Sequence, residues 1–184
     1  MTLIKGEREG IIEVAKLMLV SARTAPKTAG IDDIESAIVT GDEKDKIAEE
    51  MEQMAQEKGI RGFIRDASNV RDSDAVVIIG IRGTRSSALD CGGCGYENCK
   101  AFDEAEKKSG NDFMGPSCAF KALDLGIALG SAVKTASMLN VDNRIMYRIG
   151  AAVTRLGIME KSTIVIGIPL SATGKNLYFD RKFQ

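Results

Sequence analysis

The residues with the greatest capacity for chemistry are four cysteines near the middle of the chain. Three of them fall within the stretch Asp90-Cys-Gly-Gly-Cys-Gly-Tyr-Glu-Asn-Cys-Lys100, and the fourth is Cys118. Their spacing is C-x2-C-x4-C-x18-C. Cysteine thiolates are ligands of zinc and of iron–sulfur clusters, so this segment is a candidate metal site.

This spacing favours one [4Fe-4S] cluster bound by Cys91, Cys94, Cys99 and Cys118. Three close ligands would hold one side of the cluster, and the distant fourth ligand would close it. The glycines between the first ligands have a physical reason to be there. They let the backbone bend sharply and bring N–H groups toward the cluster, where side chains would intrude.

Three alternatives stay open beside the cluster. Structural zinc sites with four cysteines more often contain two short C-x2-C pairs, and Cys99 and Cys118 are too far apart for a second pair. Disulfides are disfavoured because a chain of this size does not need them and the rest of the sequence is typical of a cytoplasmic protein. Unligated cysteines are disfavoured because chance rarely gathers every cysteine around three glycines. With a cluster bound, we expect Lys100 and Lys121 to offset its negative charge.

The composition excludes several other kinds of chemistry. The chain has no histidine, which rules out nucleophiles activated by imidazole and zinc sites that contain histidine. It has no tryptophan and only 5% aromatic residues, so a platform for stacking sugars or bases is not expected. With 25 basic and 26 acidic residues, the near-neutral balance argues against a nucleic-acid partner. No apolar run reaches the roughly 18 residues of a membrane span, so we expect a cytoplasmic protein without a membrane partner.

Helical and extended patterns alternate along the chain, and no repeat or linker divides it. This pattern predicts a single domain over residues 1–184, with an iron–sulfur-binding segment at residues 86–121. The predicted helices cover residues 7–23, 42–58, 100–108 and 116–139, with another beginning at an Asp142 cap, and the predicted strands cover residues 34–39, 74–81 and 163–168. Residues 63–74 are expected to form a turn or a short helix, and residues 169–184 an extended tail.

Two of these elements are expected to position the cysteines. The strand at residues 74–81 is continuous in β-branched residues, which predicts burial on both faces, and the cysteine segment begins just beyond its carboxyl end. Residues 116–139 carry few charges and are expected to be the buried centre of the fold. Gly126 and Gly130 in this helix would let another backbone approach closely.

The cysteine segment also resembles a known motif. Cys91-Gly-Gly-Cys-Gly-Tyr-Glu-Asn-Cys-Lys-Ala-Phe102, followed by Gly115-Pro-Ser-Cys-Ala-Phe120, is similar to the four-cysteine [4Fe-4S] motif of corrinoid iron–sulfur proteins and related redox subunits. The whole chain resembles an uncharacterised prokaryotic family of ferredoxin-domain-containing proteins. Its other signatures are Ala22-Arg-Thr-Ala-Pro-Lys27, Val141-Asp-Asn-Arg-Ile-Met-Tyr147 and Gly167-Ile-Pro-Leu-Ser-Ala-Thr-Gly-Lys-Asn176. This resemblance implies iron–sulfur binding but brings no established activity.

A weaker resemblance connects the chain with FMN-dependent nitroreductases. Arg23-Thr-Ala-Pro-Lys27, Asp124-Leu-Gly-Ile-Ala-Leu-Gly-Ser131 and Ile166-Gly-Ile-Pro169 occur in the same order as similar segments of those enzymes. The resemblance implies an α+β fold, with a nitroreductase-like mixed sheet flanked by helices, and a homodimer that holds FMN at the subunit interface. Arg23, Lys27 and Arg181 would then lie near the FMN phosphate. The basic segment that grips this phosphate near the start of nitroreductases is missing here.

Two further patterns carry less weight. Residues 167–176 lack the spacing of a phosphate-binding Walker loop. Arg144, Arg148 and Arg155 form one stripe of a predicted helix, and such a stripe is more often a solvated face than an anion site.

The sequence therefore predicts a redox protein that transfers electrons through one [4Fe-4S] cluster. The cluster would exchange electrons with an unknown redox partner and be coupled to a flavin-dependent reduction of a small substrate. No side chain stands out as a catalytic acid, base or nucleophile, so catalysis would belong to the cofactors. The alternative is a non-catalytic protein in which a cluster or zinc serves sensing or partner binding.

Overall fold

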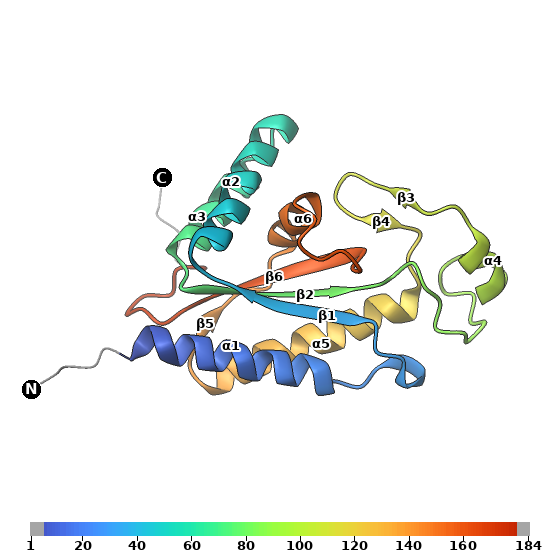
Figure 1. Ribbon diagram of the computed structural model, residues 1–184, viewed down its shortest axis with the longest axis horizontal. Coiled ribbons are helices and arrows are strands. Elements are labelled where there is room, and N and C mark those ends of the chain that lie inside the picture. Colours follow the sequence, from blue (N-terminus) through green and yellow to red (C-terminus); the bar gives the residue numbers. More distant parts are fainter. Residues whose placement is uncertain (1–5, 180–184) are drawn as a thin grey trace, which may run out of the picture.

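A four-stranded sheet lies between two layers of helices in the computed structural model, which describes residues 6–179 (Figure 1). The strand order is β1-β2-β6-β5, and each neighbouring pair is antiparallel. A separate hairpin pairs β3 with β4. The elements in chain order are α1 (Glu7–Thr24), the short 3-10 helix η1 (Thr28–Gly30), β1 (Ile34–Val39), α2 (Gly41–Lys58), α3 (Arg61–Asp72), β2 (Ala75–Ile81), α4 (Cys99–Glu104), β3 (Lys108–Ser109), β4 (Met114–Gly115), α5 (Ala119–Met138), β5 (Asp142–Asn143), α6 (Tyr147–Arg155) and β6 (Ile164–Ser171).

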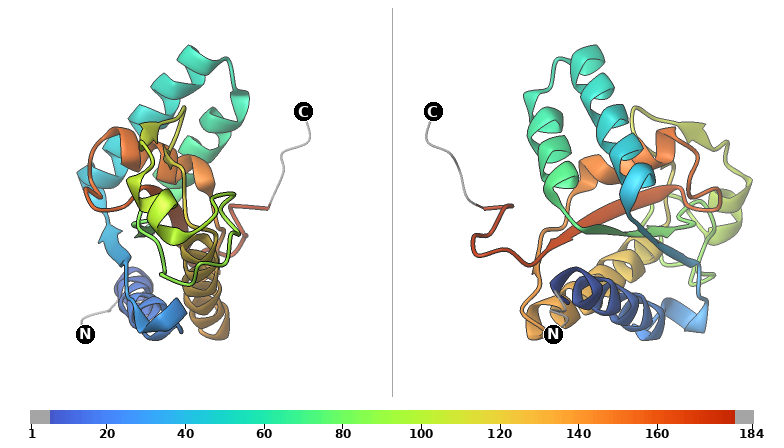
Figure 2. Two further views of the ribbon diagram at one scale, coloured as in Figure 1. Left: turned by 90° about the vertical axis from the view of Figure 1, so that its right-hand side faces the viewer. Right: turned by 60° about the vertical axis from the view of Figure 1, so that its left-hand side comes forward.

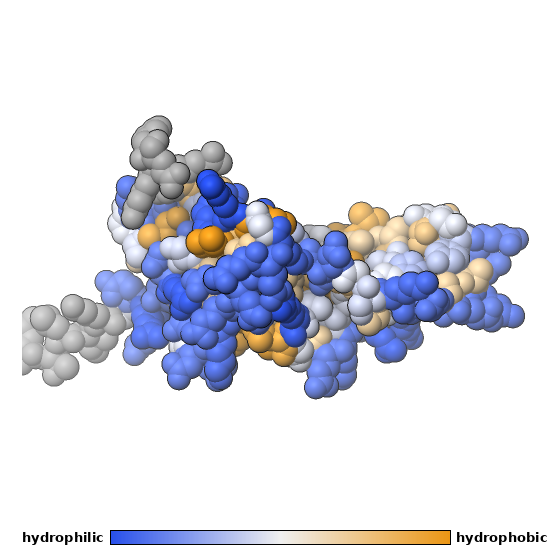
Figure 3. Space-filling model, turned by 90° about the horizontal axis from the view of Figure 1, so that it is seen from above, coloured by the Kyte–Doolittle hydropathy of each residue, from blue (hydrophilic) through white to orange (hydrophobic). Residues whose placement is uncertain are grey.

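The central strand β2 contributes to a hydrophobic core on each face of the sheet. Val77 and Ile79 pack into the core formed with α1 and α5, whereas Val76 and Ile78 pack into the core formed with α2, α3 and α6. All seven residues of β2 are buried, which explains its continuous apolar sequence. Figure 2 shows the sheet between these helical layers. Seen from the side of α2 and α3, the surface is mostly hydrophilic with apolar patches between (Figure 3).

The short helix α6 packs very closely against β6. A Cβ atom added at Gly150 would lie 1.6 Å from the carbonyl oxygen of Val165, and one added at Gly167 would lie 2.2 Å from the side chain of Ile149. Glycine is therefore required at both positions by the approach of the helix to the strand.

The α+β class, with helices flanking the sheet, is confirmed, but the mixed strand directions predicted for the sheet are wrong. Every pairing of the sheet in residues 6–179 is antiparallel. The predicted helix cap at Asp142 is also wrong, because Asp142 and Asn143 pair with the end of β6 as strand β5. Pro116 does not open α5, which begins at Ala119 with Cys118 as its N-cap residue.

The chain after β6 folds back onto its own core. Tyr178 is only 3% exposed and packs among the side chains of α2, α3 and α6. Its hydroxyl lies 2.8 Å from the hydroxyl of Ser73. The predicted extended tail is therefore replaced by strand β6 as far as Ser171 and by a packed segment at Tyr178. The single-domain prediction for residues 1–184, and the segment at residues 86–121 within it, stay predictions.

The predicted arginine stripe is a set of ion pairs and hydrogen bonds within the chain. Arg144 donates to the carbonyl oxygen of Tyr178 at 2.9 Å, and Arg148 donates to Asp66 at 2.8 Å. Arg155 pairs with acidic residues of α2. Arg148 and Arg155 therefore join α6 to α3 and α2, and Arg144, which precedes α6, binds the segment after β6. Among residues 6–179, no helix is both long enough and apolar enough to cross a membrane.

Candidate metal centre

The four cysteines come from two segments at one end of the molecule, on the right in Figure 1. Cys91 and Cys94 lie in the loop between β2 and α4, and Cys99 is the first residue of α4. Cys118 is the N-cap residue of α5, the central helix below the sheet. Cys91 is exposed, Cys94 and Cys99 are half-buried, Cys118 is buried, and all four are free.

Contacts at Cys118 bring the two segments together. The backbone N–H of Cys118 donates to the carbonyl oxygen of Gly83 at 2.8 Å, just beyond the end of β2. Its sulfur lies 3.8 Å from the hydroxyl of Ser87, near the start of the cysteine loop. The segment that follows β2 therefore contacts the amino-terminal end of α5.

The cysteine loop has an unusually coiled backbone. Four of its residues have a positive φ: Ala88 at 55°, Asp90 at 46°, Gly92 at 66° and Gly95 at 86°. This conformation favours glycine, which confirms the predicted role of Gly92 and Gly95 in bending the chain. Ala88 and Asp90 adopt it at an energetic cost, which side-chain and backbone contacts of the loop must offset.

Asp90 makes such a contact with the next turn of the chain. Its carboxylate accepts the backbone N–H of Cys99 at 2.7 Å, and its own N–H donates to the Cys99 sulfur at 3.3 Å. The same residue therefore holds the start of α4 and supplies an N–H group to a proposed ligand. The sequence prediction missed Asp90, although its place directly before Cys91 was the available signal.

The place of Cys118 at the start of α5 lowers the pKa of its thiol. Burial by itself raises the pKa of its thiol, but N–H groups of Lys121 and Phe120 in the first turn of α5, together with Ser87, bring the pKa below its ordinary value. Helix N-termini stabilise anionic sulfur, and the thiolate is the form that binds metals. The lowered pKa agrees with the predicted ligand role of Cys118.

Lys121 and Lys100, which are expected to offset the charge of a cluster, have other partners within the chain. Lys121 is fully buried, and its ammonium forms an ion pair with Asp33 Oδ2 at 2.8 Å. It also donates to the carbonyl oxygen of Ile31 at 3.2 Å. Lys100 is an exposed residue that lies 3.8 Å from Glu104. Each of these lysines therefore has an acidic partner that is not part of the cysteine segment.

The donor set fits an iron–sulfur cluster, although the four sulfurs do not form a closed set of ligands. Within residues 6–179, no three cysteine or acidic side chains are gathered as a metal site. The structure brings the two cysteine segments to one end and supplies N–H donors to Cys99 and Cys118. The assignment of Cys91, Cys94, Cys99 and Cys118 as ligands stays a prediction.

The residues expected near an FMN phosphate are engaged at the end of α1. Arg23 donates to Asp32 at 2.6 Å and to the carbonyl oxygen of Ile34 at 2.8 Å. Lys27 donates to the carbonyl oxygens of Ala22, at 2.8 Å, and of Arg23, and burial lowers its pKa. Lys27 therefore caps the carboxyl end of α1, and Arg23 binds the segment that leads into β1. Arg181 lies outside the described residues.

Comparison of the sequence with known proteins finds uncharacterised relatives. The family described as "Uncharacterized protein containing a ferredoxin domain" matches residues 114–181. A protein of Archaeoglobus fulgidus, described only as "Uncharacterized protein", is 52% identical over 175 residues, which are 95% of this chain and 94% of that protein. The archaeal relative therefore spans the cysteine loop as well as the matched carboxyl-terminal part.

Solved nitroreductases have a similar fold. The FMN-dependent nitroreductase NfnB from Mycobacterium smegmatis, in complex with NADPH, has a TM-score of 0.57 at 12% identity, over 89% of this chain and 78% of that chain. Nitroreductase CinD from Lactococcus lactis, in complex with nicotinic acid, has a TM-score of 0.57 at 14% identity, over 100% and 85%. A nitroreductase with bound FMN from Desulfitobacterium hafniense has a TM-score of 0.56 at 14% identity, over 89% and 78%. The nitroreductase-like fold is therefore confirmed.

Proposed function

The chain belongs to the family of uncharacterized proteins that contain a ferredoxin domain, and from this premise we propose that it is an electron-transfer protein with one [4Fe-4S] cluster. The proposed ligands are Cys91, Cys94, Cys99 and Cys118. The observation that supports this function best is the place of Cys118. A buried thiol with a lowered pKa lies beside the loop that carries every other cysteine of the chain.

The residues around the sulfurs have distinct roles in this proposal. When bound, the cluster would supply one-electron redox chemistry. Asp90 orients Cys99 and gives its sulfur an N–H bond, and Ser87 contacts the Cys118 sulfur. Hydrogen bonds to the sulfurs are one of the means by which a protein sets a cluster's potential. Because Cys91 is exposed, a redox partner would approach the cluster from its side. Ligation by thiolates also suits a reducing, cytoplasmic location.

A flavin is the second candidate cofactor, because solved neighbours of the same fold include nitroreductases with FMN. We propose that two copies of the chain associate through the outer face of α5. Leu123 and Ile127 are 58% and 44% exposed there, and Gly126 and Gly130 face open space instead of another backbone of the same chain. FMN at such an interface would couple the cluster to reduction of a small substrate. Arg23 and Lys27 would first have to release their partners at the end of α1.

Anaerobic purification tests the cluster directly. We expect brown protein with four iron and four sulfide ions per chain, and a broad visible absorption band that dithionite bleaches. Colourless protein with one zinc ion per chain would refute electron transfer and support the alternative of a non-catalytic metal-binding protein for sensing or partner interaction. Yellow fluorescence released into the supernatant on denaturation would decide separately whether FMN is bound. Sedimentation of wild-type protein and an Ile127→Lys variant tests the dimer.

Cys118→Ala separates a cofactor role from a purely structural role. We expect this variant to lose or degrade the cluster while the domain stays folded, because the thiol contributes little to the core in which α5 packs. The neighbouring Ser117→Ala is the matched control, since the buried Ser117 hydroxyl has no hydrogen-bond partner among the described residues. Iron content and far-UV circular dichroism report the two properties. Unfolding of cluster-free Cys118→Ala, but not of Ser117→Ala, would contradict the proposal.

A further inference from the structure

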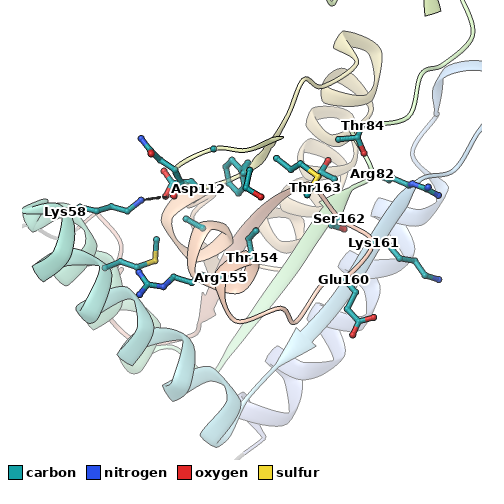
Figure 4. Close-up of a pocket in the computed structure, with 17 residues that line it drawn as sticks. Lys58, Arg82, Thr84, Asp112, Thr154, Arg155, Glu160, Lys161, Ser162 and Thr163 are labelled. Carbon is teal, nitrogen blue, oxygen red and sulfur yellow. Dashed lines mark hydrogen bonds and ion pairs between the residues drawn. The ribbon is translucent and has the colours of Figure 1, made fainter. Parts of the chain in front are cut away.

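A pocket of about 680 Å³ lies on the α2 and α6 side of the sheet (Figure 4). Its walls are the end of α2, the end of α6, the turn between β3 and β4, and the segments that follow β2 and precede β6. This volume is in the range of pockets that bind small organic molecules. The end of α1, with Arg23 and Lys27, belongs to the opposite helical layer, so this pocket is distinct from the region expected for an FMN phosphate.

Apolar side chains form part of the pocket lining. Met54 from α2 and Ala151 from α6 are buried in the core beneath it, and Phe113 packs against the same core from the hairpin. Met114 adds an exposed apolar side chain. Apolar walls of this kind favour a ligand with an aromatic or branched aliphatic body.

The charged residues at one end of the pocket are already paired. Lys58 forms an ion pair with Asp112 and donates to the carbonyl oxygen of Asn111 at 3.1 Å. Arg155 pairs through Nε with Glu50 and through Nη2 with Glu57, each at 2.8 Å. These side chains therefore form a wall and leave little uncompensated charge for a ligand.

The other end of the pocket carries cations that lack a partner. Figure 4 shows Arg82, Thr84 and Lys161 at this end, away from Lys58. Within residues 6–179, the side chains of Arg82 and Lys161 make no ion pair or hydrogen bond, and the Thr84 hydroxyl also has no partner. Glu160 at the same end is also unpaired, so the three free charges sum to one positive charge. The nearby hydroxyl of Thr163 is already bonded to the backbone of Gly83.

We propose that this pocket binds a small organic anion, with its apolar body against Phe113 and Met114 and its carboxylate toward Arg82, Thr84 and Lys161. A charge-assisted hydrogen bond from a guanidinium to a carboxylate is stronger than a neutral one. The proposal goes beyond electron transfer, since it needs neither cluster nor flavin.

The place of the pocket in the chain also connects it to the cysteines. Arg82 and Thr84 lie on the segment that leads from β2 to Cys91, and Met114 lies in β4, which leads to Cys118. A bound anion would therefore contact both segments that carry the proposed ligands.

Calorimetric titration of cluster-free protein with 2-naphthoate tests the proposal, and the uncharged isostere 2-naphthamide is the matched probe. We expect 2-naphthoate to bind the wild-type chain at least about tenfold more tightly than the amide. The Arg82→Ala/Lys161→Ala variant should lose that preference. The control variant Lys46→Ala/Lys134→Ala removes the same charge at exposed positions outside the pocket. It should keep the preference for 2-naphthoate over 2-naphthamide.

A steric variant checks the location independently of charge. Thr154 lines the pocket from α6, and Thr154→Leu should weaken binding of both probes by filling the cavity. Circular dichroism confirms folding of each variant. The proposal is overturned if neither probe binds the wild type, if acid and amide bind equally, or if the pocket and control double variants lose the same affinity. Binding unaffected by Thr154→Leu would place the anion elsewhere and would also overturn it.

Discussion

Removal of the Asp33 carboxylate should destabilise the protein strongly, because it would leave a buried cation without its partner. Lys121 is fully buried in the first turn of α5, and its ammonium lies 2.8 Å from Asp33 Oδ2. Arg85 reaches the other oxygen of Asp33 at 3.4 Å. After Asp33→Ala, the Lys121 ammonium would keep, among residues 6–179, its hydrogen bond to the carbonyl oxygen of Ile31 at 3.2 Å but no anionic partner.

The size of the effect follows from the geometry of this pair. At 2.8 Å and an effective dielectric constant of about 20, two unit charges attract by about 6 kcal/mol. Part of this attraction only offsets the cost of removing both groups from water. Deleting one partner of a buried pair typically costs about 3–5 kcal/mol, since the remaining charge stays desolvated. We expect Asp33→Ala to lower the free energy of unfolding by that amount.

Asp32, the preceding residue, is the matched control. It pairs with Arg23 at 2.6 Å, but the side chains of Asp32 and Arg23 are 35% and 49% exposed. Solvent screens such a pair, so Asp32→Ala should cost only about 1 kcal/mol. Urea unfolding of the cluster-free variants measures both changes. In the double variant Asp33→Ala/Lys121→Met, removal of the stranded cation should recover most of the lost stability.

Two results would refute this reasoning about the buried pair. One is a loss for Asp33→Ala no larger than the loss for Asp32→Ala. The other is a double variant no more stable than Asp33→Ala, which would mean that the desolvated ammonium of Lys121 is not the source of the cost.

Two further predictions concern the core. Gly150→Ala should lower the free energy of unfolding by about 3 kcal/mol or prevent folding, because the added Cβ would lie 1.6 Å from the Val165 carbonyl oxygen. A melting temperature within a few tenths of a degree of wild type would contradict this contact. Burial raises the pKa of Tyr178 from 10.0 to about 12, so the folded state keeps its phenol proton over a pH range in which the unfolded chain loses it. Stability should therefore fall between pH 10 and 12 by about 3 kcal/mol. In urea unfolding, Tyr178→Phe should lose that part of the fall. Because it removes the hydrogen bond between the Tyr178 and Ser73 hydroxyls, it should also lower the free energy of unfolding by about 1 kcal/mol at neutral pH. An unchanged alkaline slope would count against the buried phenol.

Much of the fold could be predicted from local patterns. The helix at Glu7–Thr24 and the strand at Ile34–Val39 lie where apolar spacing and β-branched residues placed them. The errors fall where tertiary contacts decide the structure. Asp142 has the chemistry of a helix cap, but pairing with β6 makes it a strand residue. Strand direction also depends on long-range pairing, so a run such as β2 could not reveal that its neighbours are antiparallel.

The candidate site could be predicted in composition but not in contacts. The cysteine spacing and the flanking glycines are local features, and Gly92 and Gly95 do adopt positive φ. The partner of Lys121 could not be found in this way, because Asp33 is 88 residues earlier and lies in the segment between η1, which packs against α5, and β1. The expected place of Arg23 and Lys27 near an FMN phosphate also rested on sequence similarity alone. Such similarity does not show that Arg23 binds the Asp32 carboxylate and Lys27 the Ala22 carbonyl oxygen.

The first turn of α5 joins the proposed cofactor site to the core. Its N–H groups favour the Cys118 thiolate, and its Lys121 side chain passes into the core to reach Asp33. The remaining three cysteines lie on a loop and a short helix whose shape depends on positive-φ residues and on the Asp90 contacts to Cys99. The proposed ligand set therefore has one member held by the core and three held by local structure. On this basis, cluster assembly would draw the loop toward Cys118 rather than move the central helix, because displacing α5 would break a buried ion pair.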